Sequence, residues 1–172
     1  MRLALYEPDI PQNAGSLMRL GACLGVGIDI IEPCGFLLSD RNFRRAGMDY
    51  LQSADIRRHE SWSRFHQSLQ DRLVLLTTRG NMVYTDFAFA PGDTLLVGRE
   101  SAGVPQPVHD AADAKLVIPL RAGLRSLNVA QAAAMVLGEA LRQTSLFPKG
   151  GPPSEAVGCD SVLTSAVRPN KE

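Results

Sequence analysis

The chain alternates short apolar runs with amphipathic stretches along most of its length, and this alternation limits the folds open to it. Short apolar runs are typical of strands that are buried on both faces, whereas the stretches between them show helical periodicity. Strands that alternate with helices predict an α/β fold, in which a mostly parallel sheet has helices on both faces. The predicted strands cover residues 3–6, 28–31, 73–77, 94–97 and 116–120, and the predicted helical segments cover residues 13–24, 41–46, 61–69, 105–111 and 128–144.

Length and composition predict one domain in a reducing compartment. A chain of 172 residues can bury a core of its own, and the stretch after Phe147 loses hydrophobic periodicity, so we expect a domain over residues 1–147 and a flexible tail over residues 148–172. The three cysteines share no metal-ligand spacing with one another or with the histidines, which predicts no metal site. With no signal-peptide pattern and no apolar run near the ~20 residues that cross a bilayer, we expect a cytoplasmic protein without membrane contact.

The charge is balanced overall and uneven locally. Because 18 basic residues face 18 acidic ones, net charge gives no support for nucleic-acid binding. All but three of the basic residues are arginine, whose planar fork suits phosphate and base edges. An arginine cluster between residues 41 and 58 is a candidate RNA contact or an ordinary solvated face. Its members are Arg41, Arg44, Arg45, Arg57 and Arg58.

Residues 115–143, KLVIPLRAGLRSLNVAQAAAMVLGEALRQ, lead from a predicted strand through a polar loop into a long helix. Arg121, Arg125, Ser126 and Asn128 supply hydrogen-bonding groups in the loop, and the small residues of the helix, Gly138 among them, allow a close backbone approach. Strand-to-helix junctions of α/β proteins are common ligand sites. As a simpler alternative, Asn128 caps a buried alanine-rich helix, although a cap needs no arginines.

Two further loops follow predicted strands. In EPDIPQNAGSLMRLGACLGV, residues 7–26, Asn13 is placed to cap a helix on which Arg19 is either functional or merely exposed. In TLLVGRESAGVP, residues 94–105, Gly98 allows backbone to approach a ligand and Glu100 follows. Three polar, glycine-bearing loops after strands predict one shared pocket at the carboxyl edge of the sheet. The dinucleotide fingerprint and the phosphate-binding P-loop are both missing from the sequence.

In this order, PQNAGSLMRL, LLVGRESAGVP and IPLRAGLRSLNVAQAAAMVL resemble the three motifs of the SPOUT RNA methyltransferases, with support from DIIEPCGF, RNFRRAGMDY and LLTTRG. The resemblance covers about residues 3–143 and is strongest to the small branch that methylates the 2′-hydroxyl of the tRNA wobble nucleotide. It implies a C-terminal trefoil knot, S-adenosylmethionine as cofactor, tRNA as substrate and a homodimer. Another tRNA or ribosomal RNA site, a knotted RNA-binding protein without catalysis, and a flavodoxin-like small-molecule enzyme are the alternatives.

The resemblance also implies roles for individual residues. The positions matching the family's catalytic motifs are Arg19, Glu100, Ser126 and Asn128, and those matching its cofactor site are Leu76, Thr77, Gly98, Ile118, Ser126 and Leu127. A guanidinium keeps its proton up to about pH 12, so we expect Arg19 to hold a phosphate and stabilise a developing alkoxide rather than to act as a base.

Overall fold

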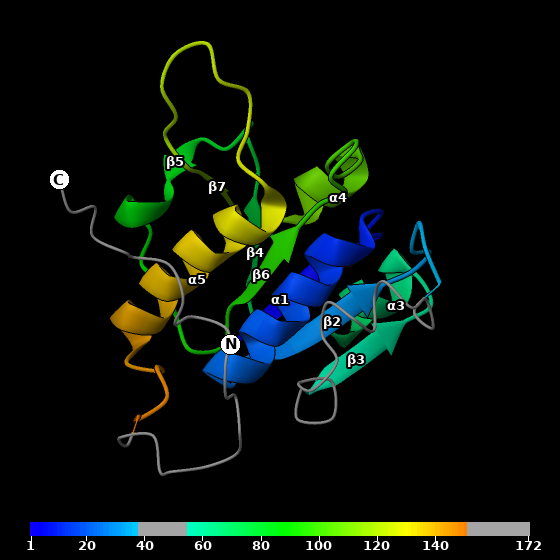
Figure 1. Ribbon diagram of the computed structural model, residues 1–172, viewed down its shortest axis with the longest axis horizontal. Coiled ribbons are helices and arrows are strands. Elements are labelled where there is room, and N and C mark those ends of the chain that lie inside the picture. Colours follow the sequence, from blue (N-terminus) through cyan, green and yellow to red (C-terminus); the bar gives the residue numbers. More distant parts are fainter. Residues whose placement is uncertain (38–54, 151–172) are drawn as a thin grey trace, which may run out of the picture.

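The computed structural model describes residues 1–37 and 55–150 (Figure 1). Arg41, Arg44 and Arg45, the helical segment predicted at 41–46, and most of the predicted tail lie outside these residues. The described residues form a seven-stranded sheet in the order β3-β2-β1-β6-β4-β7-β5, and every neighbouring pair is parallel. The strands are β1 (Arg2–Tyr6), β2 (Gly27–Ile31), β3 (Ile56–His59), β4 (Leu73–Leu76), β5 (Met82–Val83), β6 (Thr94–Val97) and β7 (Ala114–Val117).

Helices cover both faces of the sheet, as the alternation of strands and helices predicted. The helices are α1 (Pro11–Leu24), α3 (Trp62–Ser68), α4 (Gln106–Ala111) and α5 (Val129–Thr144), with a short 3-10 turn, η1 (Tyr84–Asp86). Leu3 and Leu5 of β1 belong to the core that includes residues of α1 and α5, which lie side by side across one face (Figure 1). The intervening Ala4 shares a second core with Phe65 of α3 and Val108 of α4. None of the helices in the described residues is long and apolar enough to cross a membrane.

Several element boundaries differ from the prediction. β7 ends at Val117 rather than at residue 120, two residues before Pro119, whose nitrogen cannot donate a ladder hydrogen bond. Helix α1 begins at Pro11 with Ile10 as its N-cap and no side-chain cap, so the prediction that Asn13 caps this helix is wrong. Proline suits the first helical turn, where its missing N–H leaves no intrahelical bond unmade.

Two strands are missing from the prediction, β3 and β5. The sequence of β3, IRRH, lacks an apolar run because it lies at the edge of the sheet, where its two arginines are exposed. β5 has two residues, which is too short for any periodicity.

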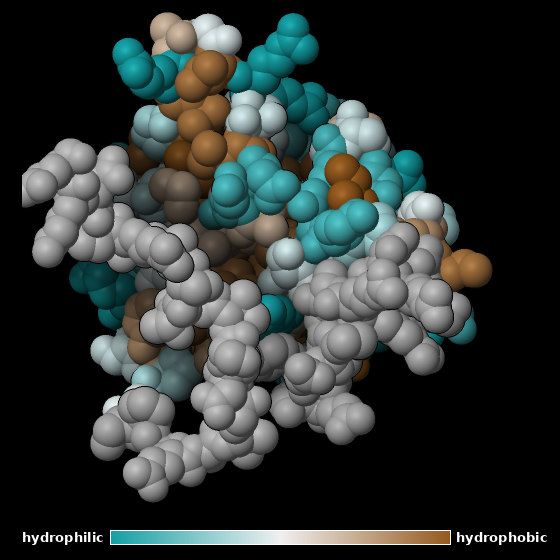
Figure 2. All heavy atoms as spheres, in the orientation of Figure 1, coloured by the Kyte–Doolittle hydropathy of each residue, from teal (hydrophilic) through white to brown (hydrophobic). Residues whose placement is uncertain are grey.

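The small residues of α5 do not all serve close packing. Ala133 and Ala140 are almost fully buried, as expected for a helix packed tightly on a sheet and on α1. A Cβ added to Gly138 would meet nothing within 4 Å, so the predicted close backbone approach at Gly138 is wrong. The loop before α5 is different again, because Leu124 and Leu127 are 66% and 38% exposed there. Figure 2 shows hydrophobic and hydrophilic side chains next to one another at this end of the molecule.

Candidate functional site

A cleft of about 480 Å³ opens where the carboxyl ends of β4, β6 and β7 meet. Its lining comes from the turn after β4, the turn after β6 and the segment after β7, together with Ile10 and Asn13 at the start of α1. Residues from all three predicted loops, within 7–26, 94–105 and 115–143, line this cleft, so their predicted convergence on one pocket is confirmed. The volume lies in the range of small-molecule sites, about 300–1,000 Å³.

The cleft brings together every residue predicted to be catalytic or cofactor-binding except Arg19. Those that line it are Leu76, Thr77, Gly98, Glu100, Ile118, Ser126, Leu127 and Asn128. Arg19 lies on an exposed face of α1 and is not among the lining residues. The geometry supports a shared site for eight positions, whereas their individual roles stay predictions.

Asn128 combines the two roles that its sequence context left open. Its Oδ1 accepts hydrogen bonds from the backbone N–H groups of Ala130 (2.9 Å) and Gln131 (3.4 Å), so it caps α5. Its Nδ2 donates to Oδ1 of Asn13 (2.9 Å), which connects the start of α5 to the start of α1 inside the cleft. The cap and the cleft therefore use opposite ends of one amide.

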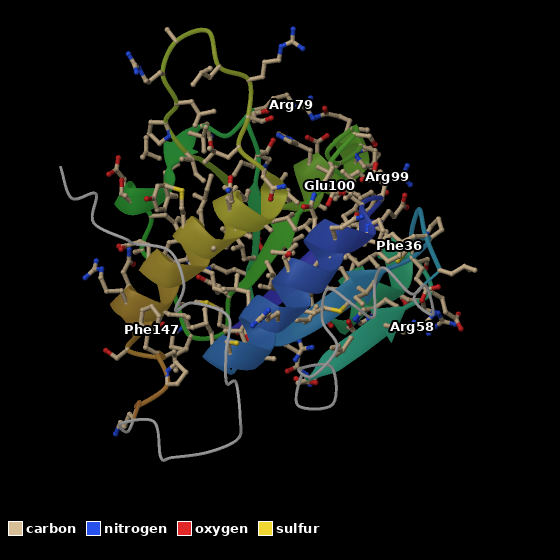
Figure 3. The ribbon with its side chains drawn as sticks, in the orientation of Figure 1. Phe36, Arg58, Arg79, Arg99, Glu100 and Phe147 are labelled. Carbon is tan, nitrogen blue, oxygen red and sulfur yellow. The ribbon has the colours of Figure 1, made fainter. Side chains whose placement is uncertain are left out.

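The turn after β6 is attached to the turn after β1 by two acidic residues that the sequence did not single out. The Asp9 carboxylate accepts from the backbone N–H of Glu100 (3.1 Å) and of Ser101 (3.3 Å), and from the Ser101 hydroxyl. Glu7 forms an ion pair with Arg99. Figure 3 shows Arg99 and Glu100 beside the N-terminal end of α1.

The pKa values of Glu100 and Asp9 are shifted in opposite directions. Burial raises the pKa of Glu100, and a hydrogen bond to the Asp9 carboxylate raises it further. The same hydrogen bond lowers the pKa of Asp9. The backbone N–H of Asp9 also donates to Oε2 of Glu100 (3.3 Å). Asp9 therefore loses its proton at a lower pH than an ordinary aspartate, and Glu100 keeps its proton to a higher pH than an ordinary glutamate.

Gly98 serves the fold of its own turn. A Cβ added there would lie 2.5 Å from the carbonyl carbon of Gly103, and the backbones of Arg99 and Gly103 exchange hydrogen bonds of 3.0 and 2.9 Å. The close approach that the structure contains is to Gly103, and the approach of a ligand to Gly98 stays a prediction. Gly98 still lines the cleft with its backbone.

The two described arginines that were predicted to bind RNA, Arg57 and Arg58, do not line the cleft. Arg57 and Arg58 project from β3, three strands away from β6 in the sheet, and both side chains are 61% exposed. Nη2 of Arg58 lies 2.6 Å from Oε1 of Glu32, and Nε of Arg57 lies 3.8 Å from Oδ1 of Asp55. These ion pairs partly neutralise the charge that the sequence offered as a phosphate contact.

The lining of the cleft suits a nucleoside-containing cofactor. Leu76, Ile118 and Leu127 contribute apolar surface for a base, whereas Thr77 and Ser126 bring hydroxyl and backbone groups that can bind a ribose or an amino-acid moiety. Within residues 1–37 and 55–150, no group of three or more His, Cys, Asp or Glu residues is arranged to hold a metal ion.

Comparison with known proteins agrees with this geometry. The model of the SpoU rRNA methylase family matches residues 1–138. The chain is 61% identical over 150 residues to the tRNA (cytidine(34)-2′-O)-methyltransferase of Beijerinckia indica subsp. indica, which covers 86% of this chain and 94% of the relative. The enzyme of the same name from Escherichia coli K12 is 38% identical over 146 residues, which cover 83% of this chain and 93% of that protein.

Solved structures share the fold. One that describes "the 2-OH methylation of C/U34 on tRNA" superposes with a TM-score of 0.78 at 40% identity, covering 83% of this chain and 94% of the other. The SpoU methyltransferase AviRb from Streptomyces viridochromogenes, solved with its cofactor AdoMet, superposes with a TM-score of 0.74 at 28% identity over 83% of this chain and 60% of its own. On these grounds the chain belongs to the SpoU methylase family of RNA methyltransferases.

Proposed function

We propose that this protein is an S-adenosylmethionine-dependent tRNA 2′-O-methyltransferase that modifies the wobble nucleotide, cytidine or a modified uridine at position 34. One observation carries the proposal: three motifs, far apart in the sequence, line a single cleft in a chain that is 61% identical to a tRNA (cytidine(34)-2′-O)-methyltransferase. The proposed tRNA substrate supports a cytoplasmic location. The relatives are named RNA methyltransferases, which leaves the flavodoxin-like small-molecule enzyme without support.

S-adenosylmethionine would supply an electrophilic methyl group in the cleft. The candidate holding residues are Leu76, Thr77, Gly98, Ile118, Ser126 and Leu127, all of which line it. AdoMet bound to a structural relative with the same fold supports this choice. The mixed lining of aliphatic side chains and backbone polar groups fits a ligand with an aromatic base and a polar tail.

The chain's own residues must orient a ribose 2′-hydroxyl and favour the loss of its proton, because a neutral alcohol is a poor nucleophile. Arg19 is the proposed electrostatic stabiliser, since a guanidinium can bind the neighbouring phosphate and an alkoxide at the same time. Ser126 and Asn128 are the proposed positioning groups. Glu100, anchored at the junction with Asp9, orients the polar side of the cleft.

Arg19 would reach the reaction from a second copy of the chain. It lies on a face of α1 that also exposes Gln12, Ser16 and Cys23, spaced as one stripe along the helix and outside the cleft lining. A homodimer that packs this stripe over the partner's cleft would complete the site.

Complementation between two inactive variants tests the shared site. Dimers mixed from Arg19→Ala chains and Ser126→Trp chains, whose own cleft is filled by the indole, contain one intact site, so random reassortment of equal amounts restores about a quarter of the wild-type activity. Mixtures that stay as inactive as the separate variants would show that Arg19 acts within its own chain.

We also propose the trefoil knot and the tail that the resemblance implies. The turn of residues 98–104 and the segment of residues 118–128, which leads into α5, line the same cleft. The chain would thread at this cleft. Residues 148–172 would form an extension beyond the methyltransferase domain, since the family model ends at residue 138.

Mapping the methylated nucleotide tests the proposed reaction. Purified protein incubated with labelled S-adenosylmethionine and total tRNA should place a 2′-O-methyl group at position 34, read by mass spectrometry of nuclease fragments. Methylation at another tRNA position or of ribosomal RNA would keep the reaction and change the substrate. Tight RNA and cofactor binding with no transfer would indicate a binding protein instead.

A further inference from the structure

Three arginines outside the predicted RNA-binding cluster are immediate chain neighbours of residues that line the cleft. Arg79 follows β4, and Arg121 and Arg125 follow β7; because β4 and β7 are paired neighbours, their continuing segments start side by side. The backbone N–H of Thr77 donates to the carbonyl of Leu116 (2.9 Å), which holds these segments together. Figure 3 shows Arg79 beside the loop that precedes α5. Chain neighbours of the three arginines, Thr78, Leu120 and Ser126, line the cleft itself.

These arginines differ from Arg57 and Arg58 in their electrostatic surroundings. All three are exposed, and none forms an ion pair with another described residue. The sequence contains no acidic residue between Asp113 and Glu139, nor between Arg72 and Asp86. An anion therefore meets an uncompensated positive surface here, whereas at β3 it has to replace a carboxylate.

We propose that Arg79, Arg121 and Arg125 bind the phosphates of a single-stranded RNA loop next to the ribose being methylated. The assignment rests on the proposed function, and it places the main phosphate contacts at the mouth of the cleft. Unpaired loops are the RNA elements most often recognised by sequence-specific proteins, and arginine forks match phosphate oxygens two at a time.

Salt-dependent binding tests this surface. Arg79→Gln, Arg121→Gln, Arg125→Gln and the triple variant are compared with the wild type for affinity to in vitro transcribed tRNA over a range of salt concentrations. Each single change should reduce the slope of log K against log[salt] by about 0.7 to 1 and raise KM for tRNA. Binding of S-adenosylhomocysteine should not change. Arg64→Gln, an exposed arginine of α3, is the matched control and should leave the slope unaltered.

A triple variant with the wild-type slope would overturn the assignment, as would a loss of S-adenosylhomocysteine affinity that accounts for the weaker tRNA binding. The result is separable from the proposed function. A wild type that binds tRNA through these arginines and transfers no methyl group would refute the reaction and leave the surface in place.

A second inference follows from the hydrogen bonds at the start of α1. Asp9 accepts three hydrogen bonds from Glu100 and Ser101, and its own N–H donates to Glu100. Gly35 abuts it, since a Cβ there would lie 2.9 Å from Cα and Cβ of Asp9. We infer that Asp9 is a positioning residue, which fixes the turn after β6 so that Glu100 faces the cleft. This inference also rests on the proposed function.

Asp9→Asn keeps the size of the side chain and loses one acceptor oxygen and the charge. It should lower kcat about tenfold or more with little change in KM for tRNA, because the cleft loses geometry rather than RNA contacts. Without an ionised partner the pKa of Glu100 returns toward its ordinary value, so the inflection of kcat against pH that Glu100 produces should move to lower pH.

Asp9→Glu, which restores the charge, should recover most of the activity. Asp86→Asn on the exposed turn η1 is the control for the same chemical change. Wild-type kcat and an unmoved pH profile in folded Asp9→Asn protein would sink the inference, and so would an equal loss in Asp9→Glu.

Discussion

Two networks of hydrogen-bonded carboxylates, one around Asp29 and one around Asp9 and Glu100, differ in their surroundings. Asp29 of β2 is 3% exposed and accepts from Nε of Arg2 (2.5 Å), while its other oxygen lies 2.7 Å from Nε2 of His59. Arg2 in turn bonds Asp55 and the carbonyl of Ile28. Each member of this group is satisfied by the protein itself. The group lies on β1, β2 and β3, away from the large cleft.

The junction of Asp9 and Glu100 uses the same residue types at the edge of an open cavity. Glu100, Asn13 and Asn128 all line the cleft, so their polar atoms can exchange a protein partner for a ligand. Residue type and burial are therefore poor guides to function in this molecule. The distinguishing property is which space a charged network borders: the junction of Asp9 and Glu100 borders the cleft of about 480 Å³, whereas in the closed network, whose members pair with one another, Arg2 and Asp29 line only a small cavity of about 150 Å³.

Asp29→Ala tests the closed network and should have the largest effect. Removing the buried carboxylate takes from Arg2 and His59 the partner that they share and leaves Arg2 with Asp55 as its remaining carboxylate, so the free energy of unfolding should fall by about 3 kcal/mol. Methyl transfer per folded molecule should stay at the wild-type level, because nothing in the network lines the cleft. Urea unfolding and initial rates on the same preparations measure both. A loss of activity that exceeds the unfolded fraction would contradict the division between the two regions.

Arg19→Ala is the reciprocal test for the cleft. Loss of an electrostatic stabiliser typically lowers a rate by about 100- to 1,000-fold, and we expect kcat to fall by that factor. Stability should change by less than about 1 kcal/mol, because the side chain is exposed. Arg19→Lys, which keeps the charge and loses the fork, should recover only part of the rate. Full methyl transfer by a dimeric Arg19→Ala protein would remove this residue from the mechanism.

The two regions also differ in how far the sequence predicts them. The apolar runs place β1, β2, β4 and β6 because a strand buried on both faces has a local signature. The three motifs place the cleft because strand ends in a parallel sheet meet at one edge. The sequence does not predict the edge strand β3, because its two central residues are exposed arginines and it therefore has no apolar run.

Contacts between distant segments leave no local pattern. Asp9 and Glu100 lie 91 residues apart, and Asp9 looks like an ordinary turn residue between two prolines until the fold brings them together. The sequence indicates that Gly98 needs a missing side chain, but it does not show that Gly103 is the segment packed against it. The sequence shows the charge of Arg57 and Arg58, but it does not show that the carboxylates of Asp55 and Glu32 lie beside them.

Asn128 both stabilises the fold, as the cap of α5, and lines the cleft, and two substitutions separate these roles. Asn128→Ala removes the cap of α5 and should lower stability by about 1 kcal/mol. Asn128→Asp keeps the capping oxygen and loses the donor to Asn13, so its stability should stay close to wild type. Both should slow methyl transfer by about three- to tenfold, the worth of one hydrogen bond. If Asn128→Asp is fully active, the contact with Asn13 has no part in the reaction.

Asp55 should give the smallest effect, and its sign follows from its ion pair. The hydrogen bond from Nη1 of Arg2 (2.5 Å) lowers the pKa of Asp55 in the folded protein. A carboxylate with a depressed folded pKa stabilises the fold above its unfolded pKa, about 3.9, and this contribution disappears as the pH falls through the folded pKa. Because the side chain is 58% exposed, solvent screening limits the contribution to less than about 1 kcal/mol.

Asp55→Asn should therefore be slightly less stable than the wild type at pH 7, and the difference should shrink toward zero below about pH 3. Urea unfolding at pH 7, 5 and 3 measures it. Arg57→Gln is the control, because Nε of Arg57 lies 3.8 Å from Asp55 and its removal should change little at any pH. A difference that stays constant down to pH 3 would mean that Asp55 contributes through packing or hydrogen bonding that its charge does not govern, and the closed network would then rest on Asp29 alone.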